Sequence, residues 1–206
     1  MHAISTRPLP ATSHGHDPPQ TLVILGPDGA GKSTLIEALT RQLLNERIRA
    51  RRLANAAARS WLTKFCRRSG ITFPTFTQDF FETSIRGFNV ARNMVSAAHS
   101  GGLSVMDRHL YCQLVLRRLR GHPSGLLLPW LAAKSTECAR IILLDIDPHL
   151  AYERIVSRGK DHETLEYLSE SRDEYLRLAQ LHGWIILDAS LSTSLLVEQL
   201  RLVIGK

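Results

Sequence analysis

The feature that most constrains this 206-residue chain is a glycine-rich octapeptide between an apolar run and an amphipathic stretch. Residues 26–33 read Gly-Pro-Asp-Gly-Ala-Gly-Lys-Ser, which fits the pattern G-x-x-x-x-G-K-[ST]. The apolar run at 21–25 predicts a strand buried on both faces, and the leucine and isoleucine spacing over 33–47 predicts a helix with one apolar stripe. A strand, such a loop and a helix in this order are typical of nucleoside triphosphate binding.

The residue types of the loop define its expected chemistry. Glycines let the backbone curl so that successive N–H groups point inward, and the following helix adds the partial positive charge of its N-terminus. We therefore expect the loop to hold the phosphates of a nucleoside triphosphate, with Lys32 on the β- and γ-phosphates and the Ser33 hydroxyl on Mg²⁺. The predicted nucleotide-binding residues are Gly26, Pro27, Asp28, Gly29, Ala30, Gly31, Lys32, Ser33 and Thr34, called here the phosphate loop.

Asp28 is unusual in this loop, because a carboxylate among phosphates is electrostatically unfavourable. It could accept a hydrogen bond from a hydroxyl group of a second substrate, it could help to hold the metal ion, or it could be an exposed turn residue. The first two interpretations make Asp28 part of the reaction centre.

Strands and helices alternate along the rest of the chain. Apolar runs at 103–107, 141–145 and 184–188 predict three more strands, and residues around 48–53 predict another. Helical patterns span residues 78–99, 110–120, 126–137, 149–158, 164–181 and 193–204. Strands separated by helices pair in parallel through right-handed crossovers. We therefore predict an α/β fold, a three-layer sandwich around a parallel, five-stranded sheet.

Composition indicates an ordinary globular protein. With 44% apolar and 22% charged residues the chain is not disordered throughout, and no apolar run reaches the ~18–20 residues of a membrane span. The three cysteines form no C-x-x-C pair, and residues 1–20 lack the apolar core of a secretory signal. We expect a cytoplasmic protein without a membrane partner, in which a disordered tail at 1–20 precedes one domain at 21–206.

The net charge of +7 arises in one segment. Residues 41–68 hold nine basic side chains and a single acidic one, Glu46, so the remainder of the chain is nearly neutral. This segment either binds an anionic substrate or partner, or forms a solvated basic face. A nucleic-acid-binding module is a less favoured function, and the N-K-x-D signature of a GTPase switch is missing from the sequence.

The phosphate loop resembles that of the thymidylate kinase family, which typically carries an Asp at the position of Asp28. Asp107-Arg108 ends the predicted strand at 103–107, where the family has a D-R-Y or D-R-H motif, and Arg86 lies 21 residues before Asp107, as the family's substrate-facing arginine does. Farther on, Leu144-Asp-Ile-Asp-Pro148, Arg154, Arg158 and Asp161-His-Glu163 look like the family's strand and lid. The resemblance covers residues 21–205 and implies a P-loop kinase that uses ATP and Mg²⁺.

The resemblance also implies roles for these side chains. Arg86 and Arg108 would bind the phosphate of the acceptor or orient it, and Asp107 would join Ser33 at Mg²⁺. Arg154 and Arg158, one helical turn apart, would belong to a lid near 154–163 that neutralises transition-state charge and excludes water. Alternatively, Arg86 and Arg108 would form salt bridges, and Arg154 and Arg158 would belong to a solvated basic helix end. The candidate catalytic residues are Lys32, Asp28, Arg108, Arg154 and Arg158.

Five of the six phenylalanines lie between residues 73 and 88, beside Arg86. Most phenylalanines in a cluster of this kind pack in the core of the protein. Phe81 is the candidate for a ring that stacks on the acceptor base.

The sequence departs from the family pattern around the acceptor. There is no Pro-Gly acceptor loop between Arg49 and Phe76, His109 replaces a common Tyr, and the Gln that commonly reads thymine has no counterpart, since Gln113 is out of register. The leading interpretation is a kinase of a pyrimidine nucleoside monophosphate, with dTMP as a candidate. The alternative acceptor is a nucleoside, a modified nucleotide or another small hydroxyl compound. Apolar faces on the long helices would also allow a homodimer.

Overall fold

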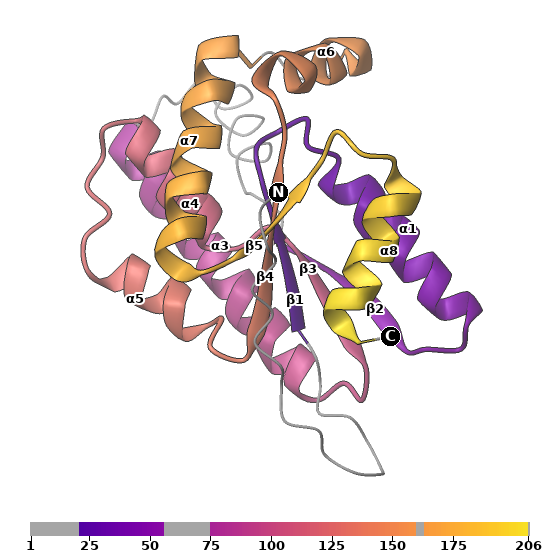
Figure 1. Cartoon of the computed structure of the whole chain (residues 1–206). Helices are drawn as coiled ribbons and strands as arrows, with labels where there is room; N and C mark the ends of the chain where they lie inside the picture. The colour runs from indigo at the N-terminus through magenta and orange to yellow at the C-terminus, as the bar shows by residue number, and fades with distance from the viewer. Residues whose placement is uncertain (1–20, 56–74, 160–162, 206) are drawn as a thin grey trace.

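A parallel sheet of five strands forms the centre of the protein (Figure 1). The computed structural model describes residues 21–55, 75–159 and 163–205, of which 75–82 are described by their backbone alone. The tail predicted at 1–20 lies outside the described residues. The strands are β1 (Thr21–Leu25), β2 (Ala50–Ala54), β3 (Leu103–Asp107), β4 (Ala139–Asp145) and β5 (Ile185–Asp188), in the spatial order β2-β3-β1-β4-β5. The predicted parallel, five-stranded sheet is confirmed.

Six of the seven helices in the described ranges cover the two faces of this sheet (Figure 1). Helices α1 (Lys32–Asn45) and α8 (Thr193–Ile204) lie on one face. The other face carries α3 (Thr75–Ala98), α4 (Tyr111–Leu119), α5 (Leu127–Lys134) and α7 (Leu165–His182). Helix α6 (Pro148–Arg158) packs on α7. These layers make the predicted three-layer α/β sandwich of a P-loop kinase.

The central strand β1 explains why two separate cores form. Its side chains alternate, so that Leu22 and Ile24 pack with α1 and α8, whereas Val23 and Leu25 pack with the helices of the opposite face. All four are essentially inaccessible to solvent, which is why the strand reads as a continuous apolar run.

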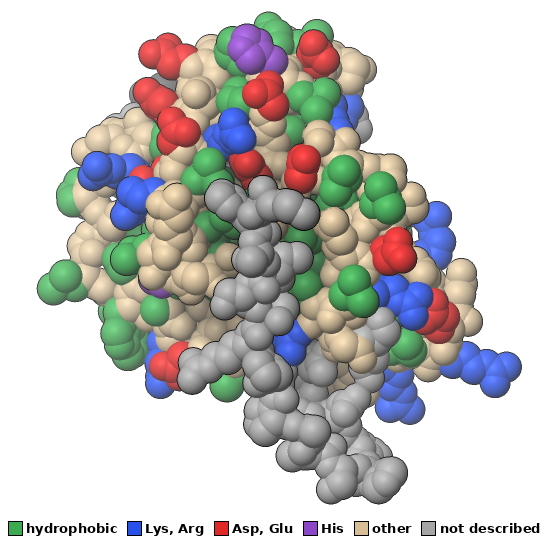
Figure 2. Space-filling view, in the orientation of Figure 1, with side chains coloured by type: hydrophobic (Ala, Val, Ile, Leu, Met, Phe, Trp, Pro, Cys, Tyr) green, Lys and Arg blue, Asp and Glu red, His purple; other side chains and the backbone are tan. Residues whose placement is uncertain are grey.

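Local sequence signals set the ends of the C-terminal helices. The Asp147 carboxylate accepts hydrogen bonds from the first turn of α6, which begins with Pro148, and Gly159 ends this helix in a left-handed conformation. Thr164 caps α7 in the same way, and α7 then presents exposed acidic residues, Glu166 and Glu170. Acidic side chains gather over this part of the surface (Figure 2).

The arrangement of the strands positions the functional region. The chain leaves β1 at the phosphate loop, and β1 is flanked by β3 on one side and β4 on the other. In open parallel sheets a ligand crevice forms beyond the carboxyl ends of strands at such a point of divergence. Within the described ranges, no helix is long and apolar enough to cross a membrane.

Candidate phosphoryl-transfer site

The phosphate loop passes so close to its neighbours that two of its glycines have no room for a side chain. A Cβ atom on Gly26 would lie 2.6 Å from the Leu144 carbonyl oxygen, and one on Gly29 would lie 2.6 Å from the Ala151 carbonyl oxygen. Both glycines, and Gly31 at the start of α1, have positive φ angles. The loop is therefore curled and held against β4 and α6 by residues that must be glycine.

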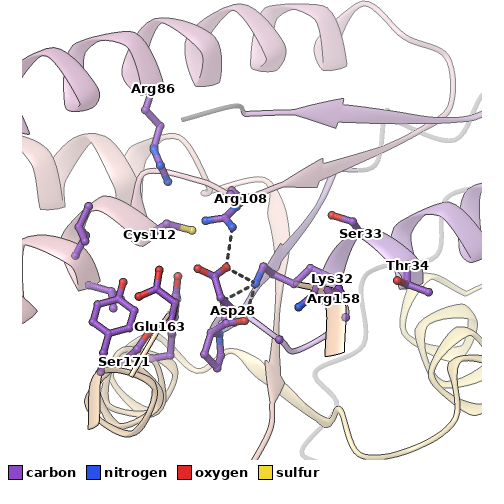
Figure 3. A pocket seen from close by; sticks show the side chains of 18 residues that line it. Asp28, Lys32, Ser33, Thr34, Arg86, Arg108, Cys112, Arg158, Glu163 and Ser171 are labelled. Carbon is purple, nitrogen blue, oxygen red and sulfur yellow. Dashed lines mark hydrogen bonds and ion pairs between the residues drawn. The ribbon is translucent and has the colours of Figure 1, made fainter. Parts of the chain in front are cut away.

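Lys32 folds back over this loop. Its ammonium group donates hydrogen bonds to the carbonyl oxygens of Gly26 (2.9 Å) and Pro27 (2.7 Å) and lies 3.7 Å from a carboxylate oxygen of Asp28 (Figure 3). Burial lowers the pKa of Lys32, and the carboxylate of Asp28 only partly offsets this effect. The Lys32 ammonium group thus bonds to carbonyl oxygens of the loop, and the oxygens of a bound triphosphate could replace them.

Asp28 joins the loop to the end of β3. Arg108 Nη2 donates a 2.7 Å hydrogen bond to Asp28 Oδ1 (Figure 3). Burial would raise the pKa of Asp28, but the charges of Lys32 and Arg108 together lower it, so the carboxylate stays ionised. The structure does not support the interpretation of Asp28 as an exposed turn residue, since its side chain is about two-thirds buried between two cations.

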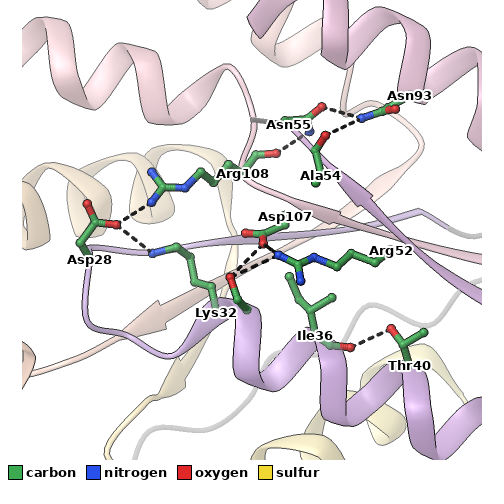
Figure 4. A network of polar contacts seen from close by, with 11 residues as sticks. Asp28, Lys32, Ile36, Thr40, Arg52, Ala54, Asn55, Asn93, Asp107 and Arg108 are labelled. Carbon is green, nitrogen blue, oxygen red and sulfur yellow. Dashed lines mark hydrogen bonds and ion pairs between the residues drawn. The ribbon is translucent and has the colours of Figure 1, made fainter. Parts of the chain in front are cut away.

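Arg108 reaches the loop because its backbone takes an unusual conformation. Its φ angle of 69° lies in the left-handed region, which non-glycine residues seldom occupy. The Asn55 amide donates a 2.6 Å hydrogen bond to the Arg108 carbonyl oxygen, and Asn93 donates to Asn55 (Figure 4). These two buried asparagines hold the turn after β3 in place.

The two predicted metal ligands lie side by side. The Ser33 hydroxyl donates a 3.1 Å hydrogen bond to Asp107 Oδ2, which places two oxygen ligands suited to Mg²⁺ between α1 and β3. The other acids at or just after strand ends have different partners. Asp145 forms a two-pronged ion pair with Arg172, Asp147 caps α6, and Asp188 accepts a hydrogen bond from the Ser190 N–H group. No group of three or more His, Cys, Asp or Glu among the described residues could hold a metal ion. Phosphate oxygens and water would have to complete the coordination, as is usual for Mg²⁺.

A cavity of about 440 Å³ opens beside the loop (Figure 3). Its walls come mainly from the phosphate loop and from helices α3, α4, α6 and α7, and most of the lining surface is polar. The lining residues outside the loop are Arg86, Arg108, Cys112, Val115, Leu116, Arg158, Glu163, Tyr167, Ser171 and Tyr175. A second hollow of about 300 Å³, on the α8 side of the loop, is lined by Thr34, Arg154, Ala189 and Thr193 among others.

Arg86 points from α3 into the larger cavity (Figure 3). Only 4% of the residue is exposed, and Nε and Nη1 have no hydrogen-bond partner in the described part of the chain. The nearby His109 is fully buried, and burial together with the Arg86 charge lowers its pKa to about 3. A neutral imidazole cannot neutralise the guanidinium, and no carboxylate of the described residues forms an ion pair with it, so within the described part of the chain Arg86 is a buried cation without a paired anion.

The structure places the two arginines of the predicted lid, Arg154 and Arg158, differently. Arg154 donates a 3.1 Å hydrogen bond to the Ala189 carbonyl oxygen and lines only the smaller hollow. Arg158 lines both cavities. The segment 160–162 of the predicted lid lies outside the described residues, as does the side chain of Phe81.

The comparisons with known proteins identify the family of this chain. The family model for thymidylate kinase matches residues 24–200, which include the phosphate loop, β3, Arg154 and Arg158. The chain belongs to the thymidylate kinase family. It is 26% identical to the "Probable thymidylate kinase" of Archaeoglobus fulgidus over 185 residues, 89% of this chain and 93% of the relative. It is also 26% identical to the "Thymidylate kinase" of Coprothermobacter proteolyticus over 188 residues, 87% of this chain and 95% of the relative.

Membership of the thymidylate kinase family makes the chain a nucleotide kinase, a phosphotransferase that acts on a nucleoside monophosphate. The resemblance read from the loop, Arg86 and Asp107-Arg108 is thereby confirmed.

Sequence reasoning missed several side chains of the site. Asn55 follows β2 directly, and a polar residue at a strand end was a usable signal. Cys112 lines the cavity but carried no signal beyond its place in a helical pattern. Arg52, which contacts Asp107, was counted only within the basic segment 41–68.

Proposed function

We propose that this member of the thymidylate kinase family transfers the γ-phosphoryl group of Mg²⁺-bound ATP to a pyrimidine nucleoside monophosphate, with dTMP as the first candidate. The observation that carries the proposal is the buried Arg86 guanidinium, unpaired among the described residues, in the same cavity as Lys32 and the Asp28–Arg108 pair. A kinase of monophosphates needs a second phosphate site beside the phosphate loop, and Arg86 supplies its charge.

The donor would bind to the phosphate loop. The backbone N–H groups and Lys32 would hold the β- and γ-phosphates, and the base would enter the hollow beside Thr34 and Arg154. Ser33 and Asp107 would hold Mg²⁺, which supplies charge neutralisation at the phosphates. Arg154 would thus contact the donor base rather than the reacting phosphate.

The acceptor would occupy the larger cavity. Arg86 and Arg108 would bind its phosphate, and Asp28 would keep Arg108 oriented and accept a hydrogen bond from an acceptor hydroxyl. An oxygen of the acceptor phosphate attacks the γ-phosphorus, and ADP leaves. Arg158, in a lid near 154–163, would neutralise charge on the transferred group, and Phe81 would stack on the acceptor base.

A second acceptor class follows from the wall formed by α4. Its cavity-facing residues are Cys112, Val115 and Leu116, and among the described lining residues no Asn or Gln reads the base. A modified or unmodified pyrimidine would then fit by shape, so acceptors with altered base substituents are the second candidate. A nucleoside is less favoured, because it has no anion for Arg86.

The test is an acceptor panel. Purified protein, ATP and Mg²⁺ are incubated with dTMP, dUMP, CMP, a 5-substituted dUMP or thymidine, and the release of ADP and the mass of the product are measured. We expect pyrimidine monophosphates to become diphosphates and thymidine to remain unmodified. Phosphorylation of thymidine without phosphorylation of monophosphates would contradict the role of Arg86.

A further inference from the structure

The side chain of Arg52 lies at the metal-binding pair. Its Nη2 atom is 2.5 Å from Asp107 Oδ2 and 3.4 Å from Ser33 Oγ (Figure 4). The two oxygens that it touches are themselves 3.1 Å apart. One guanidinium nitrogen therefore contacts both oxygen ligands proposed for Mg²⁺.

The sheet register explains how Arg52 reaches this position. Arg52 pairs with Val105, two residues before Asp107, so the two side chains lie on the same face of neighbouring strands. Its neighbour Arg51 bonds instead to Ser104 and to the carbonyl oxygen of Ser96. Of the three arginines at 49–52, Arg52 is therefore the one directed at the strand end.

The two partners of this ion pair differ in their access to water. The Arg52 side chain is 41% exposed and comes from the edge strand β2, whereas the Asp107 side chain is only 8% exposed. The Arg52 guanidinium can move into solvent at a small free-energy cost, because it is already partly exposed and water hydrates it well. The carboxylate cannot leave, and without a cation it would be a buried charge without a partner.

We propose that Arg52 is a placeholder for the metal, which neutralises Asp107 while the site is empty and is displaced when the metal–nucleotide complex binds. The inference rests on the proposed function, because it assumes the Mg²⁺ site at Ser33 and Asp107. Mg²⁺ and the guanidinium would bring positive charge to the same carboxylate oxygen, Asp107 Oδ2, and would repel each other there. Arg52 therefore competes with the metal and sets the metal concentration at which the site fills.

The alternative role for Arg52 makes the opposite prediction. If the guanidinium remained in the complex and bound the phosphates, its loss would weaken binding of nucleotide and metal. If it is a placeholder, its loss leaves Asp107 free and strengthens metal binding.

The experiment titrates Mn²⁺ into the full-length protein saturated with a non-hydrolysable ATP analogue and follows free Mn²⁺ by electron paramagnetic resonance. We expect Arg52→Met, which keeps the aliphatic stem but removes the charge, to bind Mn²⁺ about tenfold more tightly than the wild type. Arg52→Lys keeps a competing cation and should bind Mn²⁺ about as tightly as the wild type. The matched control is Arg49→Met, which removes the same charge from an exposed residue before β2 and should leave Mn²⁺ binding unchanged.

Thermal unfolding gives a second readout. Without metal, Arg52→Met should unfold at a lower temperature than the wild type, because Asp107 has lost its cation, and Mg²⁺ with the analogue should close this gap. Unchanged or weaker Mn²⁺ binding by Arg52→Met, in a protein that binds the analogue, would overturn the placeholder role alone. Failure of the wild type to bind the analogue would overturn both this inference and the proposed function.

Discussion

Replacement of Arg86 by Met should make the protein more stable and less able to bind its acceptor. Arg86 is 4% exposed, and two of its three guanidinium nitrogens have no partner among the described residues. Methionine fills the space of the aliphatic stem without a charge to desolvate. The substitution therefore removes the free-energy cost of burying an unpaired charge in the ligand-free protein. It also removes the contact proposed for the acceptor phosphate.

The magnitude follows from these unpaired atoms. An unsatisfied buried polar group costs about 1–3 kcal/mol, more when charged, so we expect Arg86→Met to gain at least about 1 kcal/mol of unfolding free energy. In a chain of this size each kcal/mol raises the unfolding temperature by roughly 2–4 °C. Loss of a charge-assisted hydrogen bond to phosphate should raise the KM for the monophosphate about 10- to 100-fold.

The assay combines thermal unfolding without ligands with a KM measurement for dTMP. Arg92→Met is the control, since Arg92 is exposed on the same helix and its loss should change neither quantity. A fall in stability of 2 kcal/mol or so in Arg86→Met would show that the guanidinium has a strong partner in the free protein and would refute the reasoning. An unchanged KM would refute the phosphate site.

Three further substitutions test other parts of the site. His109 has its pKa lowered to about 3 by burial and by the charge of a neighbouring arginine, whereas in the unfolded chain it titrates near 6.5, so acid favours unfolding below that pH. Between pH 6 and 4 the free energy of unfolding of the wild type should fall by up to about 1.4 kcal/mol per pH unit through this histidine, and urea melts of His109→Gln should lack that contribution. Asp28→Asn should leave ATP affinity unchanged or higher, since a negative charge leaves the phosphate site, and raise the acceptor KM about tenfold by freeing Arg108. Gly29→Ala should abolish measurable ATP binding, because its Cβ meets the α6 backbone, whereas Gly159→Ala, also at positive φ but with open space around it, should only lose stability by about 1–2 kcal/mol.

Each of these results has a contrary outcome. A pH slope that persists in His109→Gln would place the acid sensitivity elsewhere. Weaker ATP binding by Asp28→Asn would mean that the carboxylate serves the donor. Equal ATP affinity in the two alanine variants would mean that the close approach of the loop to α6 is unimportant.

The fold was predictable because its determining patterns are local. The apolar run at 21–25 marked the central strand, and the glycines after it marked the loop. Even β2 was placed within a few residues, although Arg51 and Arg52 obscured its pattern, since as an edge strand it needs little apolar surface. Helix ends differ from the prediction by at most three residues, as at α3, which begins at Thr75 instead of residue 78, and α8 matches at both ends.

Residues of the candidate site could be predicted only where one sequence motif indicates both where a residue lies in the fold and what chemical role it has. Lys32 and Ser33 are fixed by the loop, and Asp107 and Arg108 by the end of a buried strand. The contact of Arg52 with Asp107, 55 positions apart along the chain, depends on the pairing of β2 with β3, and the long helix α3 lies between these strands in the sequence. No local pattern specifies that register. The sequence alone therefore could not distinguish the surface cations of the basic segment from the one that contacts Asp107, a proposed metal ligand.

The most direct test of the central claim follows the γ-phosphoryl group itself. The protein is incubated with γ-labelled ATP, Mg²⁺ and dTMP, and the label is traced to nucleoside diphosphate or to inorganic phosphate. We predict label in dTDP, at a rate that depends on dTMP and is lost in Lys32→Ala. Label that appears only as inorganic phosphate, at a rate that no nucleoside monophosphate stimulates, would contradict the account.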